Sequence, residues 1–519
     1  MKKIFSIILS LSISLGLYAQ TPNWAENIAP ILYNNCTSCH HSGGLAPFSL
    51  MDYQDAVNNA GSMKNDVTIR KMPPWPPDHN FKELSHQRVL SDANIKTIQE
   101  WVTNGTPQGD LAKAPTKPIY NGNSVITNPD LTISIPSYTI QASTDEYRCF
   151  PIKSNLSTDM YITEMEVLPG NTKVVHHVLV FRDLSNTPFT LDAADTAAGY
   201  LNFGGTGSNS SELIGAWVPG QGLISYPKGL GIKIPAGSNI ILQIHYPGGN
   251  VGQQDQTKVN FKFTTGTIRD LTISPLLNHS ISLINGPLYI SANTTKSFKA
   301  KYIIGADASV LGVGPHMHLI GKKIKVYGIL PVTKDTLKLI KIDNWDFHWQ
   351  GFYGFKKVLK IPKGTTLYAD SYYDNTTNNS NNPNSPPKDV SLGEATTDEM
   401  MLVYFTFMGY QKGDENIVID STASATGVDG YLLESGGDKI NIYPNPANNY
   451  IQINTKDIPT GNYQLQVYDI TGKCVIDEKR SINNNNTFTL NTEALINGNY
   501  MLKLSSDKQV FLQKFGVGK

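Results

Sequence analysis

The stretch VVHHVLVF, residues 174–181, combines a β-strand pattern with two adjacent histidines. Its apolar residues are mostly β-branched or aromatic, which favours a strand over a helix. Runs of the same kind, separated by Gly, Pro and Asn turns, are DLTISI (130–135), GIKIP (231–235), NIILQIHYP (239–247), VNFKFTT (259–265) and KIKVYGIL (323–330). Nearly 300 residues of short strands predict two β-sandwich domains, over residues 129–275 and 276–420.

Composition and charge exclude some functions. The chain has 519 residues, of which 40% are hydrophobic and 17% are charged, a globular composition with room for about three or four domains. The formal net charge is zero. We therefore expect no nucleic acid or anionic membrane surface as a partner.

The N-terminus has the features of a secretory signal peptide. It reads MKKIFSIILSLSISLGLYAQ, with two lysines, an apolar core and a small residue at Ala19. We expect a signal peptide over residues 1–19 and an exported protein, secreted or at the cell surface. No later segment reaches about 18 consecutive apolar residues, so we expect no transmembrane segment.

The stretch NNCTSCHHSGG, residues 34–44, has the C-x-x-C-H spacing of a covalently bound haem c. Cys36 and Cys39 would bind the haem covalently, and His40 would be the proximal axial ligand. An amphipathic helix precedes the motif, and SDANIKTIQEWVTNGTP later predicts a helix with Ser91 as its N-cap. Residues 21–111 therefore predict a small all-α cytochrome c-like domain.

The sequence offers several candidates for the second axial ligand of the haem. Met72 in RKMPPWPPD is our choice, because a Met ligand on a stiff downstream loop is common in such domains. Met63, His79 and His86 are the alternatives. His41 adjoins the proximal ligand and cannot reach the opposite face of the porphyrin. A cytochrome domain passes electrons, so an electron acceptor is expected elsewhere.

Five histidines fall in apolar runs that we predict to be strands: His176, His177, His245, His316 and His318. Histidine is not a favoured core residue and needs a partner when it is buried. Residues two apart on a strand share a face, so the His-x-His pair is able to meet one metal ion. Adjacent strand residues point apart, so the His-His pair needs a bulge or a strand end. Imidazole ligands suit Zn, Cu, Fe or Ni, and a thioether adds a preference for Cu(I).

The order of these motifs resembles the copper type II, ascorbate-dependent monooxygenases, which include peptidylglycine α-hydroxylating and dopamine β-monooxygenases. The resemblance covers about residues 130–415 and consists of His-His, His-Tyr, His-x-His and Glu-Met, the last within TTDEMMLVYFTFMGY (396–410). It implies two jelly-roll-like sandwiches, each with one copper ion. It also implies hydroxylation of a C–H bond of a small-molecule or peptide substrate with O2 and an external reductant.

The resemblance also assigns ligands. The electron-transfer copper would be bound by His176, His177 and His245, and the catalytic copper by His316, His318 and Met400. Glu399 before the thioether ligand and Tyr404 four residues after it fit the family pattern, so the resemblance favours Met400 over Met401. His316, His318, Met400 and Tyr404 would form the catalytic site.

Three features depart from the family pattern. Gly314 stands where the peptide-hydroxylating members have an Arg that holds a substrate carboxylate, and Leu402 stands where they have an Asn. We therefore do not predict peptide amidation. Family members are rich in disulfides, whereas this region has only Cys149.

The last 80 residues resemble the C-terminal sorting domain of the type IX secretion system. The YPNP stretch (443–446), a D-x-x-G-K turn (469–473) and a final strand ending in Lys carry this resemblance. It implies that residues 438–519 are recognised by the type IX secretion machinery. The alternative is a small accessory β-sandwich.

The sequence thus predicts a mainly β protein with a small all-α N-terminal domain. Our leading hypothesis is an exported copper monooxygenase with two copper ions, supplied with electrons by a fused haem c. The alternative is a non-catalytic haem and copper electron relay or a copper-binding protein. A zinc hydrolase is disfavoured, because it would have no use for a haem.

Overall fold

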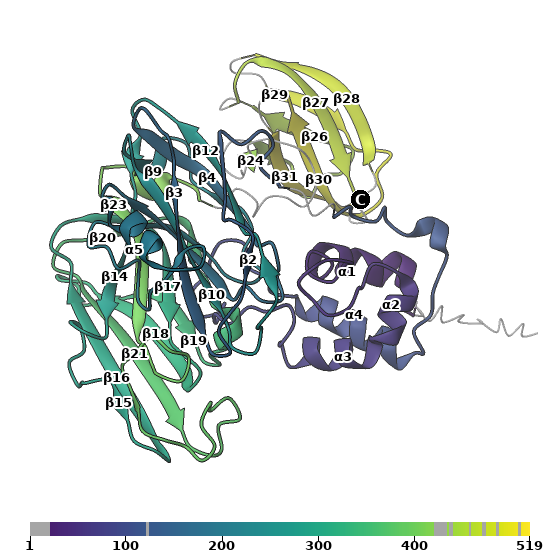
Figure 1. Ribbon diagram of the computed structural model, residues 1–519. Coiled ribbons are helices and arrows are strands. Elements are labelled where there is room, and N and C mark those ends of the chain that lie inside the picture. Colours follow the sequence, from purple (N-terminus) through teal and green to yellow (C-terminus); the bar gives the residue numbers. More distant parts are fainter. Residues whose placement is uncertain are drawn as a thin grey trace, which may run out of the picture. The chain divides into compact units, whose positions relative to one another are not determined.

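A computed structural model describes residues 21–120, 124–419, 433–434, 440–455, 458–469, 474–483, 487–506 and 510–519. The expected signal peptide lies outside these residues. The chain forms two compact units, Met1–Asp420 and Ser421–Lys519. It is mainly β with a small N-terminal helical segment (Figure 1), which confirms the predicted fold class.

The helical segment surrounds its own small core. Its elements are η1 (Trp24–Ile28), α1 (Ala29–Asn35), α2 (Tyr53–Asn58), α3 (Ala60–Thr68), α4 (Asp92–Thr103) and η2 (Leu111–Lys113). The predicted cap of the last long helix is present, since the Ser91 side chain accepts a hydrogen bond from Asn94 N–H. Ile95, Ile98 and Trp101 face inward from this helix. Its amphipathic pattern therefore explains how it packs.

Between α3 and α4 the chain leaves this helical core. We call residues 71–91 the docking loop. Within it, Asp78 N–H donates to the Lys341 carbonyl at 2.7 Å and Ser85 N–H donates to the Gly354 carbonyl at 2.8 Å. Trp75 packs against the core of the second sandwich. This loop therefore fixes the helical segment to the second sandwich, whereas the chain that follows α4 leads into the first sandwich.

The first sandwich has two main sheets that enclose one apolar core. One sheet has the order β1-β12-β4-β9-β13, with β8 beside β4, and the other has the order β6-β3-β10-β5-β7. Its elements are β1 (Leu131–Ser134), β2 (Tyr138–Thr139), β3 (Glu146–Lys153), β4 (Met160–Leu168), β5 (His177–Asp183), α5 (Thr187–Ala194), β6 (Tyr200–Leu201), β7 (Glu212–Trp217), β8 (Ile224–Ser225), β9 (Leu230–Ile234), β10 (Asn239–Tyr246), β11 (Gln254–Asp255), β12 (Lys258–Thr264) and β13 (Arg269–Asp270).

The second sandwich has two four-stranded sheets, β14-β23-β17-β20 and β16-β21-β18-β19. Its elements are β14 (Thr272–Asn278), β15 (Tyr289–Ile290), β16 (Thr294–Ile303), β17 (Ala308–His316), β18 (Gly321–Ile329), β19 (Thr336–Ile342), η3 (Phe347–Trp349), β20 (Tyr353–Ile361), β21 (Thr366–Asn375), β22 (Val390–Ser391), β23 (Leu402–Gly409) and η4 (Asp414–Asn416). Leu311, Val358 and Met408 of this sandwich belong to the core of the first. The two sandwiches therefore pack together through apolar contacts.

The C-terminal unit is a small β-sandwich with its own core. Its sheets have the orders β24-β31-β30-β27-β28 and β25-β26-β29. The strands are β24 (Leu433–Glu434), β25 (Asn441–Tyr443), β26 (Tyr450–Asn454), β27 (Gly461–Tyr468), β28 (Cys474–Ile482), β29 (Thr487–Asn491), β30 (Gly498–Ser505) and β31 (Val510–Val517). Most of the D-x-x-G-K turn lies outside the described residues.

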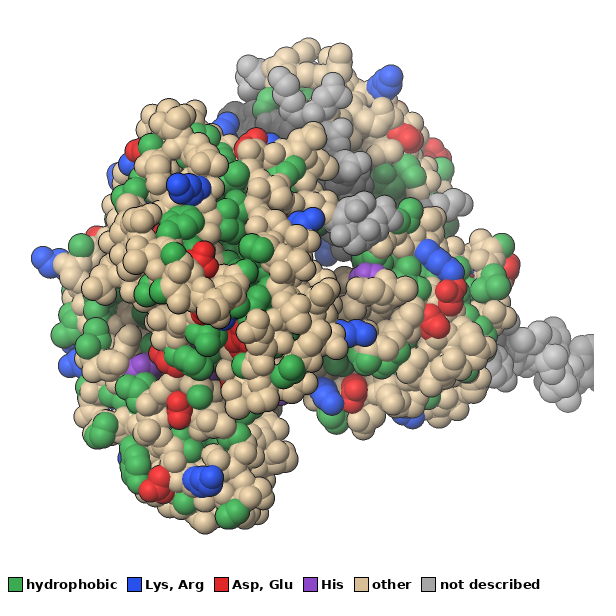
Figure 2. Space-filling model, in the orientation of Figure 1, with side chains coloured by type: hydrophobic (Ala, Val, Ile, Leu, Met, Phe, Trp, Pro, Cys, Tyr) green, Lys and Arg blue, Asp and Glu red, His purple; other side chains and the backbone are tan. Residues whose placement is uncertain are grey.

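The surface carries mixed charge. On the face shown in Figure 2, basic and acidic side chains are scattered among polar and apolar ones. This agrees with the net charge of zero. Within the described parts of the chain, no helix is long and apolar enough to cross a membrane.

Candidate active site

Three histidines meet at the ends of neighbouring strands in the first sandwich. His245 on β10 lies directly opposite His177 on β5 in the antiparallel register, so their side chains share one face of the sheet. His176 N–H donates to the His245 carbonyl at 2.9 Å. His176 was predicted to lie inside a strand. It instead directly precedes β5, because residues 171–175 form a turn. This strand end lets the adjacent histidines face one centre.

The ring nitrogens of this cluster are spaced like ligands of one metal ion. His176 Nδ1 lies 3.3 Å from His177 Nδ1 and 3.2 Å from His245 Nδ1. Two nitrogens bound tetrahedrally at about 2.0–2.1 Å lie roughly 3.3 Å apart. Burial lowers the pKa of His176 to about 3, so this ring is neutral at pH 7. Within the described part of the chain, this is the only such group of three or more His, Cys, Asp or Glu.

The outer contacts of the cluster come from both sandwiches. His176 Nε2 and His245 Nε2 are buried without a hydrogen-bond partner, and the Asp145 carboxylate lies 3.8 Å from His245 Nε2. Asp145 also accepts a hydrogen bond from Thr396 N–H of the second sandwich at 3.2 Å. The Tyr147 ring stacks on His245, with 4.2 Å between centroids. These contacts fix the orientation of the His245 ring.

The second histidine pair lies at the end of β17. His316 is the last residue of this strand. His318 was expected in the same strand but lies two residues beyond its end. Each Nδ1 has a partner, since His316 Nδ1 lies 2.5 Å from Gln350 Oε1 and His318 Nδ1 lies 3.1 Å from the Asp398 carbonyl. These contacts leave both Nε2 atoms free for a metal ion. Burial lowers the pKa of His316 to about 4 and that of His318 to about 3.

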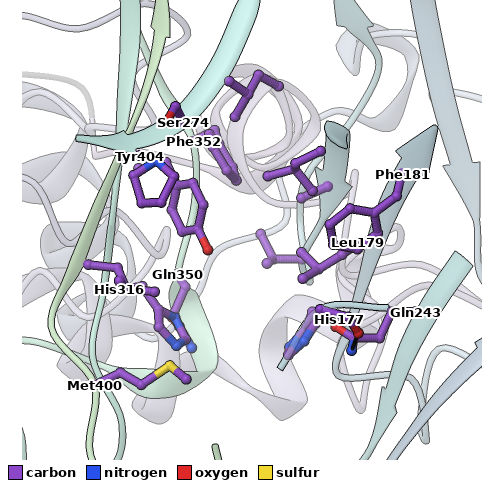
Figure 3. Close-up of a pocket in the computed structure, with 18 of the residues that line it drawn as sticks. His177, Leu179, Phe181, Gln243, Ser274, His316, Gln350, Phe352, Met400 and Tyr404 are labelled. Atoms are coloured by element: carbon purple, nitrogen blue, oxygen red, sulfur yellow. Dashed lines mark hydrogen bonds between the residues drawn. The ribbon is translucent and has the colours of Figure 1, made fainter. Parts of the chain in front are cut away.

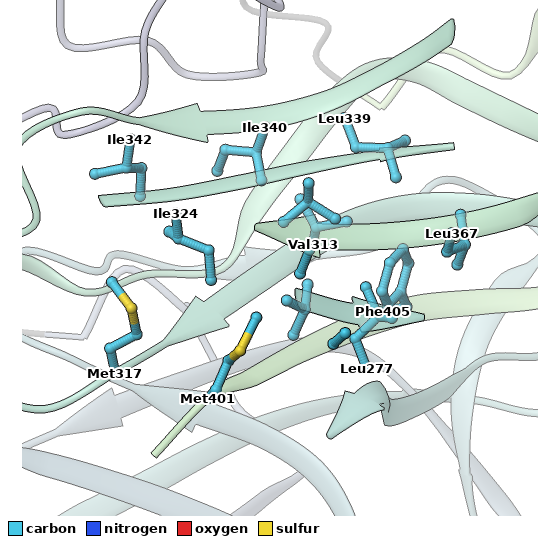
Figure 4. Packing of buried hydrophobic residues seen from close by; sticks show 14 of the residues in the cluster. Leu277, Val313, Met317, Ile324, Leu339, Ile340, Ile342, Leu367, Met401 and Phe405 are labelled. Carbon is cyan, nitrogen blue, oxygen red and sulfur yellow. The ribbon is translucent and has the colours of Figure 1, made fainter. Parts of the chain in front are cut away.

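Met400 and Met401 point into different surroundings. Met400 lines a cavity beside the histidine pair, and Figure 3 shows its sulfur close to the His316 ring. Met401 is buried in the core of the second sandwich together with Met317 (Figure 4). Of the two methionines, only Met400 therefore faces the cavity that His316 and His318 also line.

Glu399 connects the two segments that carry these side chains. Its buried carboxylate accepts hydrogen bonds from His318 N–H and Ile320 N–H, both at 2.9 Å, and from Met400 N–H at 3.1 Å. Burial nevertheless raises the pKa of Glu399 to about 8. Since one carboxyl group holds both backbones, Glu399 positions His318 and Met400 relative to each other.

The two sites share a cavity of about 620 Å³. In Figure 3, His177 lies on one side of it, and His316 and Met400 lie on the other. Apolar side chains from both sandwiches line much of the wall, among them Leu179, Phe181, Ile214, Ile273, Pro275, Phe352 and Leu402. The cavity is thus large enough for a small organic molecule.

Two aromatic rings occupy the region around Gly314. Tyr404 is the cross-strand neighbour of Gly314 on β23, and its ring lies 5.8 Å from that of Phe352. A Cβ atom at Gly314 would approach the Phe352 ring to 3.0 Å. A larger residue at this position would therefore have to displace Phe352. This explains physically why the chain has no long basic side chain there.

Several residues near the sites were not found from the sequence. Phe347 of η3 stacks on His176 at 4.6 Å between centroids and meets His318 edge-on at 5.8 Å. His279 also lines the cavity, and its Nδ1 accepts the Met401 N–H at 3.1 Å. The aromatic-rich stretch DNWDFHWQG (343–351), which has no strand pattern, was the available signal for Phe347 and Gln350.

The haem motif follows α1 in the helical segment. Cys36 and Cys39 are not joined in a disulfide, and His40 Nδ1 lies 3.1 Å from the Phe48 carbonyl. This contact leaves His40 Nε2 free, which fits an axial ligand. His41 instead bonds the Thr37 carbonyl at 2.8 Å and stacks on Tyr120.

The candidates for the second axial ligand lie in different places. Met63 is buried in the helical core. Met72 is half-buried and follows α3, and its N–H donates to the Asp66 carbonyl at 3.2 Å. His79 and His86 lie farther along the docking loop. Met72 therefore stands where the loop leaves the helical segment.

Several solved structures show a distant similarity to the chain. A β-glucuronidase from Parabacteroides merdae has a TM-score of 0.13 and 10% identity over 43% of this chain and 28% of its own. PNGF-II has a TM-score of 0.24 and 9% identity over 54% and 66%. These scores are too low to indicate a shared overall fold.

Sequence comparisons are more specific. Residues 131–252 and 291–425 match the N-terminal and C-terminal domains of the copper type II ascorbate-dependent monooxygenases, and residues 441–517 match a secretion system C-terminal sorting domain. A tyramine β-hydroxylase from Caenorhabditis briggsae is 26% identical in an alignment of 321 residues that covers 56% of this chain and 50% of the relative. The chain thus spans about half the length of this curated relative.

Each monooxygenase match contains one of the two groups of side chains described above. The first monooxygenase match contains His176, His177 and His245, and the second contains His316, His318 and Met400. The third match covers most of the C-terminal unit and indicates export to the cell surface or beyond. In chain order, the protein thus has matches to both domains of the copper type II ascorbate-dependent monooxygenases and then to a secretion system C-terminal sorting domain.

Proposed function

We propose that this chain is an exported copper monooxygenase that hydroxylates a C–H bond of a small organic substrate. One copper ion would be bound by His176, His177 and His245 and the other by His316, His318 and Met400. The observation that carries the proposal is that both groups border one cavity of about 620 Å³. An enzyme needs such a space beside its metal, whereas a simple electron relay does not.

The side chains of the second site suit the proposed chemistry. When bound, copper supplies the one-electron steps and the activation of O2. The neutral imidazoles and the soft thioether of Met400 favour the reduced ion. Gln350 and the Asp398 carbonyl hold the two rings with Nε2 free. Phe352 and Leu402 give the wall an apolar surface beside the metal ligands.

We further propose that haem c on Cys36, Cys39 and His40 supplies the electrons, with Met72 as the second axial ligand. The contact between His40 Nδ1 and the Phe48 carbonyl supports this role, because axial histidines commonly donate their second nitrogen to the backbone. Residues 1–19 would direct export, residues 21–111 would form the haem domain, and residues 438–519 would address the type IX secretion machinery.

Metal content and oxygen uptake test the proposal together. We expect purified protein to bind two copper ions and one haem per chain and to consume O2 when ascorbate is added. Tyramine is the first substrate to test, because the curated relative is a tyramine β-hydroxylase. Oxygen from ¹⁸O2 should appear in a hydroxylated product. Zinc or a single copper ion, without oxygen uptake, would instead indicate a non-catalytic relay.

A further inference from the structure

The docking loop brings an aromatic side chain from beside the haem ligands into the second sandwich. Trp75, three residues after Met72, meets the Tyr353 ring edge-on at 5.4 Å between centroids. The Arg88 guanidinium lies 6.0 Å from the Trp75 ring and donates to the Gly220 carbonyl of the first sandwich at 3.2 Å. Trp75 is therefore held where the loop contacts both sandwiches.

Aromatic residues continue from this point to the first histidine cluster. Tyr353 O–H donates to the carbonyl of Trp349, the last residue of η3, at 3.5 Å. Phe347, the first residue of η3, stacks on His176 with centroids 4.6 Å apart and ring planes at 16°. Trp75, Tyr353, the η3 turn and His176 are thus linked in series by two ring contacts, one hydrogen bond and the backbone of η3.

The start of the docking loop also lies near η3. The hydrogen bond from His348 lowers the pKa of Asp346, and the positive charge of Lys71 adds to this effect. Lys71 precedes Met72, and the His348 ring lies 6.4 Å from the His176 ring. The charge of Lys71, next to the proposed axial ligand, thus acts on Asp346, which precedes the aromatic ring stacked on His176.

We propose that Trp75, Tyr353 and Phe347 form an internal route that carries electrons from the haem to the copper bound by His176, His177 and His245. This inference rests on the proposed function. In each transfer the haem iron loses one electron and Cu(II) gains it to become Cu(I), with no bond made and no proton moved. Ascorbate, the external reductant, restores the ferrous haem. Two such transfers supply two electrons. With these electrons and two protons, O2 and the C–H substrate give an alcohol and water.

Flash reduction of the full, haem- and copper-loaded chain tests the route directly. Under anaerobic conditions a photoreductant reduces the haem, and the loss of ferrous-haem absorbance then reports transfer to Cu(II). We expect Trp75→Leu and Phe347→Leu each to slow this loss about tenfold. Phe347→Tyr should restore most of the rate, because the ring is kept. The Cu(II) spectrum by electron paramagnetic resonance reports whether the copper site is intact in each variant.

Phe298→Leu is the matched control, because Phe298 is buried in the same sandwich core but has no place in the series. It should keep the parent rate. Parent rates in both Trp75→Leu and Phe347→Leu, with haem and copper spectra intact, would overturn the route and leave the proposed function standing. Protein with no haem spectrum would overturn the route together with the proposed haem supply, and the missing spectrum would distinguish this failure from the first.

Discussion

The two histidine sites face the same cavity but are built differently. In the first, strand register and one backbone hydrogen bond bring three rings together, and the Nδ1 atoms of His177 and His245 each lie within 3.3 Å of that of His176. In the second, each of two rings at a strand end is held by a separate partner, Gln350 for His316 and the Asp398 carbonyl for His318. The first site is thus fixed by the sheet, and the second by side-chain and loop contacts.

This difference corresponds to different tasks under the proposed function. A site that only accepts and passes an electron works best when its ligands do not rearrange. A site that reacts with O2 and substrate needs an open position, and the His316 and Met400 side of the cavity provides space for one. The dependence on outer partners makes the second site the more sensitive of the two to substitution.

Replacement of Met400 should have the largest effect. We expect Met400→Ile to lower product formation at least about 100-fold, because the thioether ligand of the second site is lost. Copper at the His176 cluster should remain, since no residue of that cluster is changed. Product assays, together with copper analysis of the purified variant, check this prediction.

Met401→Ile is the matched control for that experiment. Met401 is buried in the core (Figure 4), so its replacement should leave turnover near the parent value and cost about 1 kcal/mol of stability. If turnover were lost in Met401→Ile and kept in Met400→Ile, the ligand assignment would be wrong.

The contrast between the sites also shows what the sequence was able to predict. Strand patterns such as NIILQIHYP and VNFKFTT predicted β10 and β12 within one or two residues, because alternating or continuous apolar runs reflect burial directly. The helix that ends in Thr103 was predicted from its cap and stop signals. These features depend on neighbours in the sequence.

The remaining features depend on contacts between distant segments. Gln350, which holds His316, comes from an irregular stretch 34 residues away, and no local pattern indicates its partner. The docking loop was predicted as a stiff axial-ligand loop, but its residues Trp75 and Leu84 join the core of the second sandwich. Prolines indicate that a loop is stiff and do not show what it packs against.

Glu399→Gln should have the next largest effect, again confined to the second site. Above pH 8, where the Glu399 carboxyl is ionised, the amide would place a donor against one of the N–H groups of His318, Ile320 or Met400, and an unsatisfied buried donor costs about 1–3 kcal/mol. With His318 and Met400 less firmly held, we expect copper affinity at this site to fall about 10–100-fold. Copper titration should show one weakened and one unchanged site. Equal weakening of both would contradict the separate roles.

Gln350→Leu tests the outer partner alone. The variant removes the acceptor at His316 Nδ1 without touching a proposed metal ligand, and we expect about tenfold weaker copper binding at the second site. Gln350→Glu, which keeps an acceptor, should retain most of the affinity. Competition with a copper chelator measures both variants, and identical affinity in Gln350→Leu and the parent would show that this hydrogen bond does not support the site.

One last effect concerns stability rather than copper binding, at the contact that joins the two sandwiches. Asp414 is buried at η4, and Arg269 and Ser309 donate hydrogen bonds to it. Although burial opposes ionisation, these bonds hold the pKa of Asp414 at about 2, below its ordinary value of 3.8. This group therefore contributes stability that is complete above pH 4 and is lost as the pH falls toward 2. We expect Asp414→Asn to lower the free energy of unfolding by about 2 kcal/mol near pH 7. In urea unfolding, the difference from the parent should shrink below pH 4. A difference that stays constant down to pH 3 would mean that the ionised carboxylate is not the stabilising form.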